Sequence, residues 1–445
     1  MKKTILLILL PVAIFAQSFM LSNIPLPKTY IQNLDPYECD EECLQEYLDN
    51  GMIFSFLSHA YDKLENMEQN EARVMFVSIF NLGSFHSNAQ LRIALLLPYK
   101  KIGKYASSTT NASFAYLMTK GHPFMLKSYK VESEEKEDLK IVLDQMRVDG
   151  FEYIIAPLTK KGADNIIAIN PAVNIYFPTI NKKDVNTSSP FLSFGAIDYT
   201  AQSDLLLKEA LTPLVIFSDR SQTGKKLARH QKEEFLHPTP IAKLAENNEN
   251  SFFDAALSVF TNSAPQELES VDRDTTKKVE KKKVITNFIS RRTTNLESYL
   301  KEKEEIVNGT FFINTPIIKS GMVMSQLTLY DVNATNILST QINYDPLLLS
   351  MTQYIDRRDM VVANSITKNN NILIETNSLL GNDIIYDWIN YTTTVGVDYF
   401  YSLITDEDRI YNTRVENNQM IYEIELLQPS RSKFVKYVRP NKELK

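Results

Sequence analysis

The stretch RIALLLPYKKIGKYASSTTNASFAYL, residues 92–117, decides the fold of this chain. It opens with a continuous apolar run that stops at Pro98, and such a run is typical of a short strand buried on both faces. A helix is predicted to follow over about residues 105–119. The alternation of buried strands with helices indicates right-handed βαβ units around a parallel sheet.

The same alternation continues downstream to residue 366. Residues 133–150 are predicted to form a helix that Ser133 caps and Gly150 ends. Glu134 and Glu135 suit the positive end of its dipole. The other expected elements include helices at 222–236, 251–260, 295–305 and 317–332, and strands at 124–131, 151–159, 211–219, 283–290, 309–316, 336–344 and 359–366. We therefore expect an α/β fold of two doubly wound parallel sheets.

The C-terminal part closes this pattern. Residues 378–398, SLLGNDIIYDWINYTTTVGVD, are predicted to form one long helix that carries Trp388. Its aromatic side chains recur at helical spacing, which favours packing in the core over an interface anchor. Residues 408–438 alternate like two antiparallel strands, with a turn at Asn417-Asn418.

The N-terminus has the form of a secretory signal. Residues 1–17, MKKTILLILLPVAIFAQ, combine two lysines, a short apolar run and a small residue, Ala16, suited to cleavage. The apolar run is too short for a membrane span, which needs about 20 residues. No cysteine follows it to carry a lipid. We expect export to the periplasm, with no transmembrane segment in the mature chain.

Residues 18–90 are predicted to form a linker and a helical extension. Residues 40–68 fit one helix or two short ones, with Asn50-Gly51 as the break, and residues 71–85 fit either a strand or a buried helix. Cys39 and Cys43 are the only cysteines. Three states fit this pair: a local disulfide, two free thiols, or half of a zinc site. In each of them the pair is structural.

Composition excludes several classes of function. Glycine accounts for 12 of 445 residues, and no GxGxxG or GxxxxGK[ST] motif occurs, which argues against nucleotide-dependent enzymes. The net charge is −6 and no basic stripe stands out, so nucleic-acid binding is not expected. HExxH and GxSxG are absent, and the five histidines are scattered. We therefore expect no enzyme activity, no cofactor and no metal site.

The order of the motifs resembles the type I periplasmic-binding-protein superfamily. Residues 92–117 are similar to its first strand, ligand loop and helix, and LVIFSDRSQTGKKLARHQKEEF resembles the start of its second lobe. LLGNDIIYDWINY and the closing hairpin are similar to the binding-protein-like domain of outer-membrane lipoprotein activators of peptidoglycan synthases. The resemblance implies a two-lobed domain over residues 91–438: lobe 1 at about 91–195, lobe 2 at about 211–335, a return between lobes at about 336–438, and a tail at 439–445.

Ligands of such folds bind beyond the carboxyl ends of the strands, in the cleft between the lobes. Hydroxyl groups beside a helix start can hold a carboxylate or phosphate there, or they can simply cap the helix. Tyr99 and Tyr344 could sandwich a ligand or fill a closed cleft. The candidate ligand-binding residues are Tyr99, Ser107, Ser108, Thr109, Thr110, Pro157, Asp219, Asn314, Thr315 and Tyr344.

Two functions follow from this pattern. In the first, the chain is a non-catalytic scaffold or regulator of cell-envelope assembly that binds an envelope protein. In the second, it is a receptor for a small polar ligand, such as an amino acid, that serves a transporter or sensor. About 75 residues separate the predicted cleavage site from the first strand, and this extension favours the first. The polar stretch 263–283 is predicted to be a disordered loop.

Overall fold

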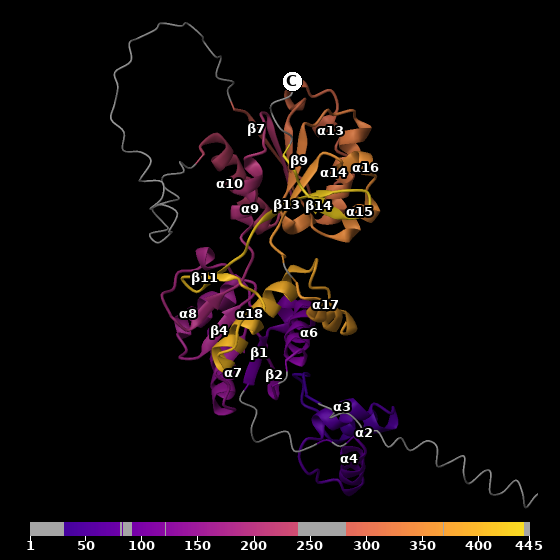
Figure 1. Cartoon of the computed structure of the whole chain (residues 1–445), viewed down its shortest axis with the longest axis vertical. Helices are drawn as coiled ribbons and strands as arrows, with labels where there is room; N and C mark the ends of the chain where they lie inside the picture. Colours follow the sequence, from indigo (N-terminus) through magenta and orange to yellow (C-terminus); the bar gives the residue numbers. More distant parts are fainter. Residues whose placement is uncertain are drawn as a thin grey trace, which may run out of the picture. The chain divides into compact units, whose positions relative to one another are not determined.

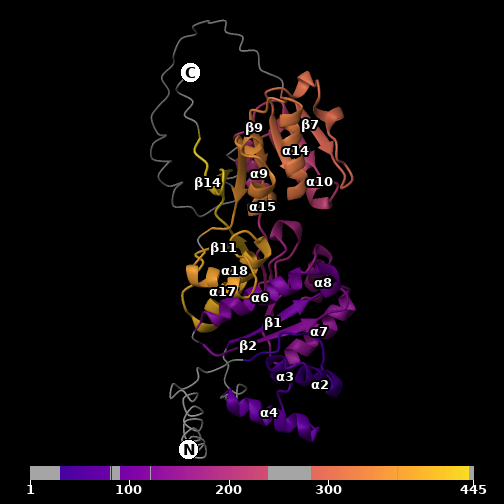
Figure 2. The same ribbon diagram turned by 90° about the vertical axis from the view of Figure 1, so that its right-hand side faces the viewer.

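The structure, a computed structural model, describes residues 31–80, 82, 91–120, 122–238, 282–367 and 369–439 (Figures 1 and 2). The chain divides into two units: Met1–Gly195 with Thr393–Ile410, and Ala196–Thr392 with Tyr411–Lys445. The predicted signal, the predicted helix at 251–260 and the polar stretch up to residue 281 lie outside the described residues.

The first seven-stranded sheet has the order β11-β12-β5-β4-β3-β1-β2. The five strands β5, β4, β3, β1 and β2 are parallel to one another. Strands β11 and β12 form an antiparallel pair. Asn417 and Asn418 join these two at positive φ, so the predicted turn is confirmed. The strands are β1 (Leu91–Leu97), β2 (Phe124–Lys130), β3 (Tyr153–Ile155), β4 (Asn174–Phe177), β5 (Leu192–Phe194), β11 (Arg414–Glu416) and β12 (Gln419–Ile421).

The second seven-stranded sheet has the order β14-β13-β10-β9-β8-β6-β7. Strands β7 to β10 and β6 are parallel, and the antiparallel pair β13 and β14 closes one edge. The strands are β6 (Leu214–Ser218), β7 (Val284–Phe288), β8 (Thr310–Asn314), β9 (Asn336–Ser339), β10 (Met360–Asn364), β13 (Glu425–Pro429) and β14 (Phe434–Lys436).

Helices accompany both sheets (Figure 1). The α/β prediction is confirmed, because each parallel strand alternates with helical chain as the apolar pattern indicated. Strand β1 shows why: Ile93 to Leu97 are fully buried, as expected of a strand covered on both faces. The longer helices are α6 (Tyr105–Met118), α7 (Lys136–Val148), α8 (Lys160–Ile169), α9 (Tyr199–Leu207), α10 (Gln222–Leu236), α14 (Ile317–Leu329), α17 (Asn371–Leu379) and α18 (Trp388–Thr405).

Two predicted helix boundaries are wrong. The long helix over 378–398 is two helices, because Gly381 adopts φ +71° after α17 and Asp383 then accepts backbone N–H bonds from Ile385 and Tyr386. These bonds hold the chain in a turn before α18 begins at Trp388.

Ser133 does not cap α7, which begins three residues later with Glu135 at the N-cap position. The hydroxyl of Ser133 instead donates to Asp138 at 2.5 Å. Gly150 does follow the end of α7, at φ +77°. Glu134 serves a different helix: its Oε1 accepts from the N–H of Thr159, the N-cap residue of α8, at 2.7 Å. Its negative charge thus lies at the positive end of α8.

Residues 31–80, here called the N-terminal helical module, contain α2 (Glu41–Asp49), α3 (Ile53–His59) and α4 (Met67–Ile79). The break between two short helices is where the sequence predicted it, with Gly51 at φ +67°. The ambiguous stretch that begins at residue 71 is helical up to Ile79. Leu44, Phe56, Leu57 and Ala60 form the module's small core.

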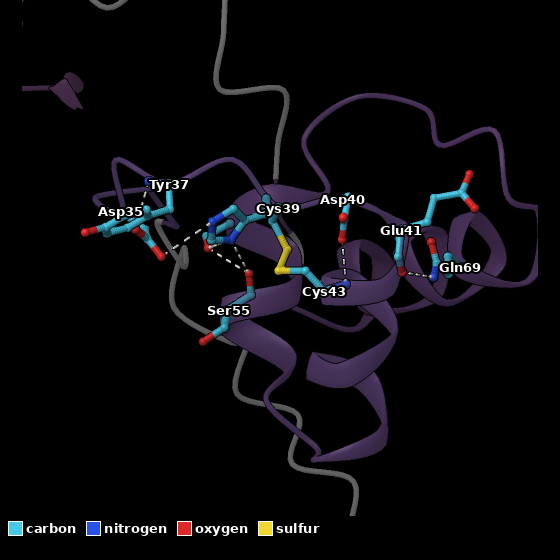
Figure 3. The surroundings of a disulfide bond; sticks show 10 residues. Asp35, Tyr37, Cys39, Asp40, Glu41, Cys43, Ser55 and Gln69 are labelled. Atoms are coloured by element: carbon cyan, nitrogen blue, oxygen red, sulfur yellow. Dashed lines mark hydrogen bonds and ion pairs between the residues drawn. A yellow bond between two sulfur atoms is a disulfide. The ribbon is translucent and has the colours of Figure 1, made fainter. Parts of the chain in front are cut away.

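A disulfide joins Cys39 and Cys43, across the N-terminal end of α2 (Figure 3). Asp40 lies between them and accepts from the N–H of Cys43 at 3.0 Å as the helix cap. In the same view, Gln69 of α4 reaches the carbonyl of Glu41, which fixes α4 against α2. None of the helices in the described part of the chain is long and apolar enough to cross a bilayer.

Candidate functional site

The amide of Asn314, at the carboxyl end of β8, is used inside the second unit. Its Nδ2 donates to Gln231 Oε1 at 2.6 Å, and Gln231 Nε2 donates back to Asn314 Oδ1 at 3.1 Å. Gln231 lies on α10, and both side chains are buried. This reciprocal pair holds the end of the strand against the helix that covers it.

The next two candidates in the second unit also make internal contacts. The hydroxyl of Thr315 lies 2.8 Å from Ser320 Oγ, and both residues are fully buried. The ring of Tyr344 lies 4.9 Å from the rings of both Tyr386 and Phe434, in one of the hydrophobic cores. Burial raises the pKa of Tyr344 well above its usual value. Tyr344 therefore fills space within its own unit.

The four hydroxyl residues from Ser107 to Thr110 lie within α6 and do not precede it. Ser107 donates to the carbonyl of Lys104 at 2.8 Å, and Thr110 donates to that of Ala106 at 3.0 Å. The N-cap of α6 is Lys104, which makes no side-chain cap bond. The capping alternative for this cluster is therefore wrong. Thr109 is fully buried, and its hydroxyl has no hydrogen-bond partner among the residues that the structure describes.

The remaining candidates of the first unit, Tyr99 and Pro157, lie directly after strands β1 and β3. Tyr99 contacts Tyr37 of the helical module, with 6.1 Å between the ring centroids. Burial, together with the charge of Asp35, raises the pKa of Tyr99 to about 12. Pro157 is buried in the turn between β3 and α8.

A pocket of about 270 Å³ opens at the carboxyl ends of three neighbouring parallel strands, β6, β7 and β8, within the second unit. Of the predicted residues it contains only Asp219. For Arg291 the sequence offered only its place soon after strand β7, and the pairing of β7 with β6 is what brings it to Asp219. The lining residues are Asp219, Arg220, Ser221, Ile289, Ser290, Arg291, Pro316 and Lys319.

In the loop after β6, the carboxylate of Asp219 lies very close to the backbone of Gly224. Asp219 Oδ1 accepts from Ser221 Oγ at 2.6 Å and from Ser221 N at 3.1 Å. Ser221 in turn caps α10 through the N–H of Gly224 at 3.0 Å. A Cβ atom at position 224 would lie 2.2 Å from Asp219 Oδ1, so this loop requires glycine there.

The pocket carries excess positive charge. Arg220 and Arg291 are exposed, and neither forms an ion pair within the described part of the chain. Lys319 Nζ donates to the carbonyl of Thr293 at 2.5 Å, which leaves its charge uncompensated. Helices α10 and α14 begin at this pocket, and helix starts favour negative charge. With three cations against the single carboxylate of Asp219, the pocket suits an anionic group.

The described residues contain no group of histidine, cysteine and carboxylate side chains that could hold a metal ion. The chain matches no protein-family model and no curated protein. Solved structures do match. One, described as a branched-chain amino acid ABC transporter of Rhodospirillum rubrum, has a TM-score of 0.54 and 9% identity, and covers 78% of this chain and 99% of its own.

A branched-chain amino acid ABC transporter periplasmic ligand-binding protein of Burkholderia xenovorans is equally similar, with a TM-score of 0.53 and 9% identity. It covers 78% of this chain and 94% of its own. The chain has the type I periplasmic-binding-protein fold. The C-domain of LpoA from Haemophilus influenzae, described as a regulator of PBP1A, has a TM-score of 0.49 and 10% identity, with coverage of 78% of this chain and 100% of that domain.

Proposed function

We propose that this chain is a non-catalytic binding protein of the periplasm that holds another envelope protein, as a scaffold or regulator of envelope assembly. One observation carries the proposal: polar side chains at the carboxyl ends of the second sheet are hydrogen bonded to one another. The pair Asn314–Gln231 is the clearest case. A receptor site for a small solute keeps a few polar groups ready for its ligand.

A second group of buried amides at the ends of β9 and β10 is hydrogen bonded in part, since Gln341 Nε2 has no partner among the residues that the structure describes. Gln341 Oε1 accepts from Gln202 Nε2 at 3.1 Å and from Ser365 N at 2.8 Å. Gln202 Oε1 accepts from the N–H of Gln341 at 2.9 Å. Buried amides paired in this way stabilise the fold of their unit, and separating them would cost the desolvation of each group.

The helical module supports the same function because it is attached by specific contacts to the first sheet. Gln32 Nε2 donates to the carbonyl of Phe124 at 2.5 Å, and Gln32 Oε1 accepts from the N–H of Leu126 at 2.8 Å. The side-chain amide of Gln32 thus pairs with the edge strand β2 as a backbone peptide group of an adjacent strand would. Tyr37 adds contacts with Tyr99 and with the ammonium of Lys130, at 4.6 Å from its ring centroid. A binding protein for small solutes has no need of such an addition.

Photo-crosslinking in cells tests this function. A photoreactive amino acid replaces exposed residues of each unit, for example Ile141 and Ile372. We expect a covalent adduct with one envelope protein from at least one position, and recovery of the protein in the periplasmic fraction. Recovery of the uncrosslinked chain alone from all positions contradicts the scaffold function. A purely cytoplasmic protein contradicts the location.

A second function, a receptor for a small anionic solute, is favoured by the basic pocket at Arg220, Arg291 and Lys319. A thermal-shift panel of amino acids, dicarboxylates and phosphates tests it, since the stabilisation by a ligand grows with the logarithm of its concentration over Kd. Arg291→Gln is expected to abolish the shift. Arg292→Gln, at an exposed neighbour outside the pocket lining, is the matched control. A flat panel rules this function out.

A further inference from the structure

The N-terminal helical module is strongly acidic. Residues 31–80 contain eleven aspartate and glutamate residues against one lysine and one arginine, a net charge of −9, although the whole chain has only −6. All eleven acidic residues are exposed. Within the described chain their one ion-pair partner is His59, with Nε2 4.0 Å from Asp35 Oδ2. The module therefore presents a field that attracts cations.

Helix α4 of this module has apolar side chains on both sides. Its inner side, including Phe76, Val77 and Phe80, packs on the module's core. The outer side carries Met67, Val74, Met75 and Ile79, which are 75%, 53%, 50% and 52% exposed. Spacings of seven and four residues place these side chains on one helix face. We call them the outer face of α4.

Phe54 of α3 is a separate exposed aromatic residue of the module. Its side chain is 54% exposed, and its ring lies 5.0 Å from that of Phe80 on the inner side. Helix α4 is held against α2 on its inner side. Gln69 is buried there and donates from Nε2 to the carbonyl of Glu41 at 2.9 Å. Exposed apolar side chains with the charged Glu68 and Glu71 between them, on a fixed helix, form an amphipathic surface that suits docking.

We propose that the outer face of α4 docks a basic amphipathic segment of the envelope partner; this inference rests on the proposed scaffold function. The apolar side of such a segment covers Met67, Val74, Met75 and Ile79, as amphipathic helices do on other apolar surfaces. Its lysines and arginines meet Glu68 and Glu71, which lie exposed among these residues on α4. Complementary charge adds rate and selectivity to the apolar contact.

Charge excludes the two other obvious occupants of the patch. A second copy of this chain would bring two modules of −9 each into contact. A lipid surface with anionic headgroups repels an acidic module, whereas polybasic segments are the ones it attracts. The basic amphipathic segment is the occupant for which both the apolar and the electrostatic interactions are favourable.

The test measures fluorescence anisotropy of the full mature chain with a labelled 18-residue peptide of leucine and lysine that forms a basic amphipathic helix. Two further peptides serve as comparisons: the same composition in scrambled order, and the same pattern with glutamate in place of lysine. We expect the helical basic peptide to bind at least about tenfold more tightly than either. Its affinity should fall as salt rises from 50 to 300 mM (chosen conditions).

Val74→Ser/Met75→Ser is expected to weaken binding about tenfold, because it removes half of the apolar contact. Glu68→Gln/Glu71→Gln should mainly reduce the salt dependence. The matched control is Ile141→Ser/Val148→Ser, which changes two exposed apolar residues on one face of α7, in the same unit. Circular dichroism melts check that each variant is folded.

Four results overturn the inference. The first two are equal binding of the scrambled peptide and equal binding of the basic peptide by the Val74→Ser/Met75→Ser chain. The other two are that the wild-type chain dimerises, or binds vesicles of anionic lipid, and that the Val74→Ser/Met75→Ser variant loses this property. Failure of the two proposals can be told apart. If the crosslinked partner persists in the Val74→Ser/Met75→Ser chain, the docking surface is wrong and the scaffold function stands. If the peptide binds as expected but no partner is trapped, the scaffold function is wrong.

Discussion

The phenol of Tyr116 donates a 2.7 Å hydrogen bond to the carboxylate of Asp398, although 282 positions separate the two residues in the sequence. Both side chains are fully buried, and Asp398 also accepts from the N–H of Ile410 at 2.8 Å. Tyr116 lies on α6 and Asp398 on α18. The bond therefore fastens the helix that follows the first strand to the helix on which the chain returns to this unit.

Tyr116→Phe should destabilise the first unit by about 1–3 kcal/mol, because it deprives a buried carboxylate of a donor. Chemical denaturation measures this loss. Tyr330→Phe removes a comparable phenol bond, 3.0 Å from Asn295, at an exposed site, and should cost less than about 0.5 kcal/mol. Equal effects of the two substitutions would show that Asp398 does not depend on Tyr116.

Gly396→Ala should destabilise the same unit by about 1–3 kcal/mol through overpacking. An added Cβ would lie 2.1 Å from Cε1 of Tyr176, whose ring is fully buried. Gly321→Ala is the control, since its nearest neighbour, Thr352 Cγ2, is 3.3 Å away and alanine favours the helix by about 1 kcal/mol. Thermal unfolding of both variants compares them. A Gly396→Ala chain as stable as wild type would contradict the packing.

His230 should make the second unit more stable at mildly acidic pH. Its Nε2 lies 2.6 Å from Asp204 Oδ1, and this bond raises the pKa of His230 above 6.5. The extra stability is fully present below the unfolded pKa and is lost as pH rises through the folded pKa. The pair is partly exposed, so we expect less than about 1 kcal/mol.

Thermal unfolding of the wild type and His230→Gln at pH 5.5 and pH 9 (chosen conditions) measures this effect. The variant should lose more stability at the lower pH. His237→Gln changes an exposed histidine at the end of the same helix and serves as the control. A constant difference between wild type and His230→Gln at both pH values would refute the expected linkage.

Gln32→Met should expose the edge of the first sheet. The substitution removes both bonds to β2, so the amide of Leu126 should exchange its hydrogen about tenfold faster. Hydrogen exchange read residue by residue measures it. Gln45→Met removes two bonds within the module, one to Asp49 at 2.9 Å and one from Gln69 at 3.3 Å, and it should leave Leu126 unchanged. Unaltered protection in the Gln32→Met chain would mean that the module contributes nothing to this edge.

The sequence predicted the strands well because their burial depends on local composition. The apolar run that stops at Pro98 is typical of a strand covered on both faces, and β1 is such a strand. The site was harder to predict, since it depends on partners distant in sequence. Asn314 lies at the end of its strand, but Gln231, 83 positions away, determines that its amide faces inward. The strand ends alone do not contain that information.

The same reason explains two further differences. Glu134 was assigned to the helix that follows it, yet it caps a helix 25 positions downstream through Thr159. Arg291 was not predicted as a site residue, because only the pairing of β7 with β6 brings the two loops together. Sequence periodicity gives the faces of single elements. It does not give the partner of a loop residue across a sheet edge.

The ring of Tyr176 lies where side chains at two distant glycines would otherwise be. A Cβ atom at Gly195 would be 1.7 Å from its hydroxyl, and one at Gly396 would be 2.1 Å from its ring. These three positions are therefore expected to evolve as one unit: lineages that keep a tyrosine at 176 must keep both glycines, and alanine at 195 or 396 becomes tolerable only after that tyrosine has been replaced. Of the 12 glycines in the chain, two are therefore required by the position of one aromatic side chain.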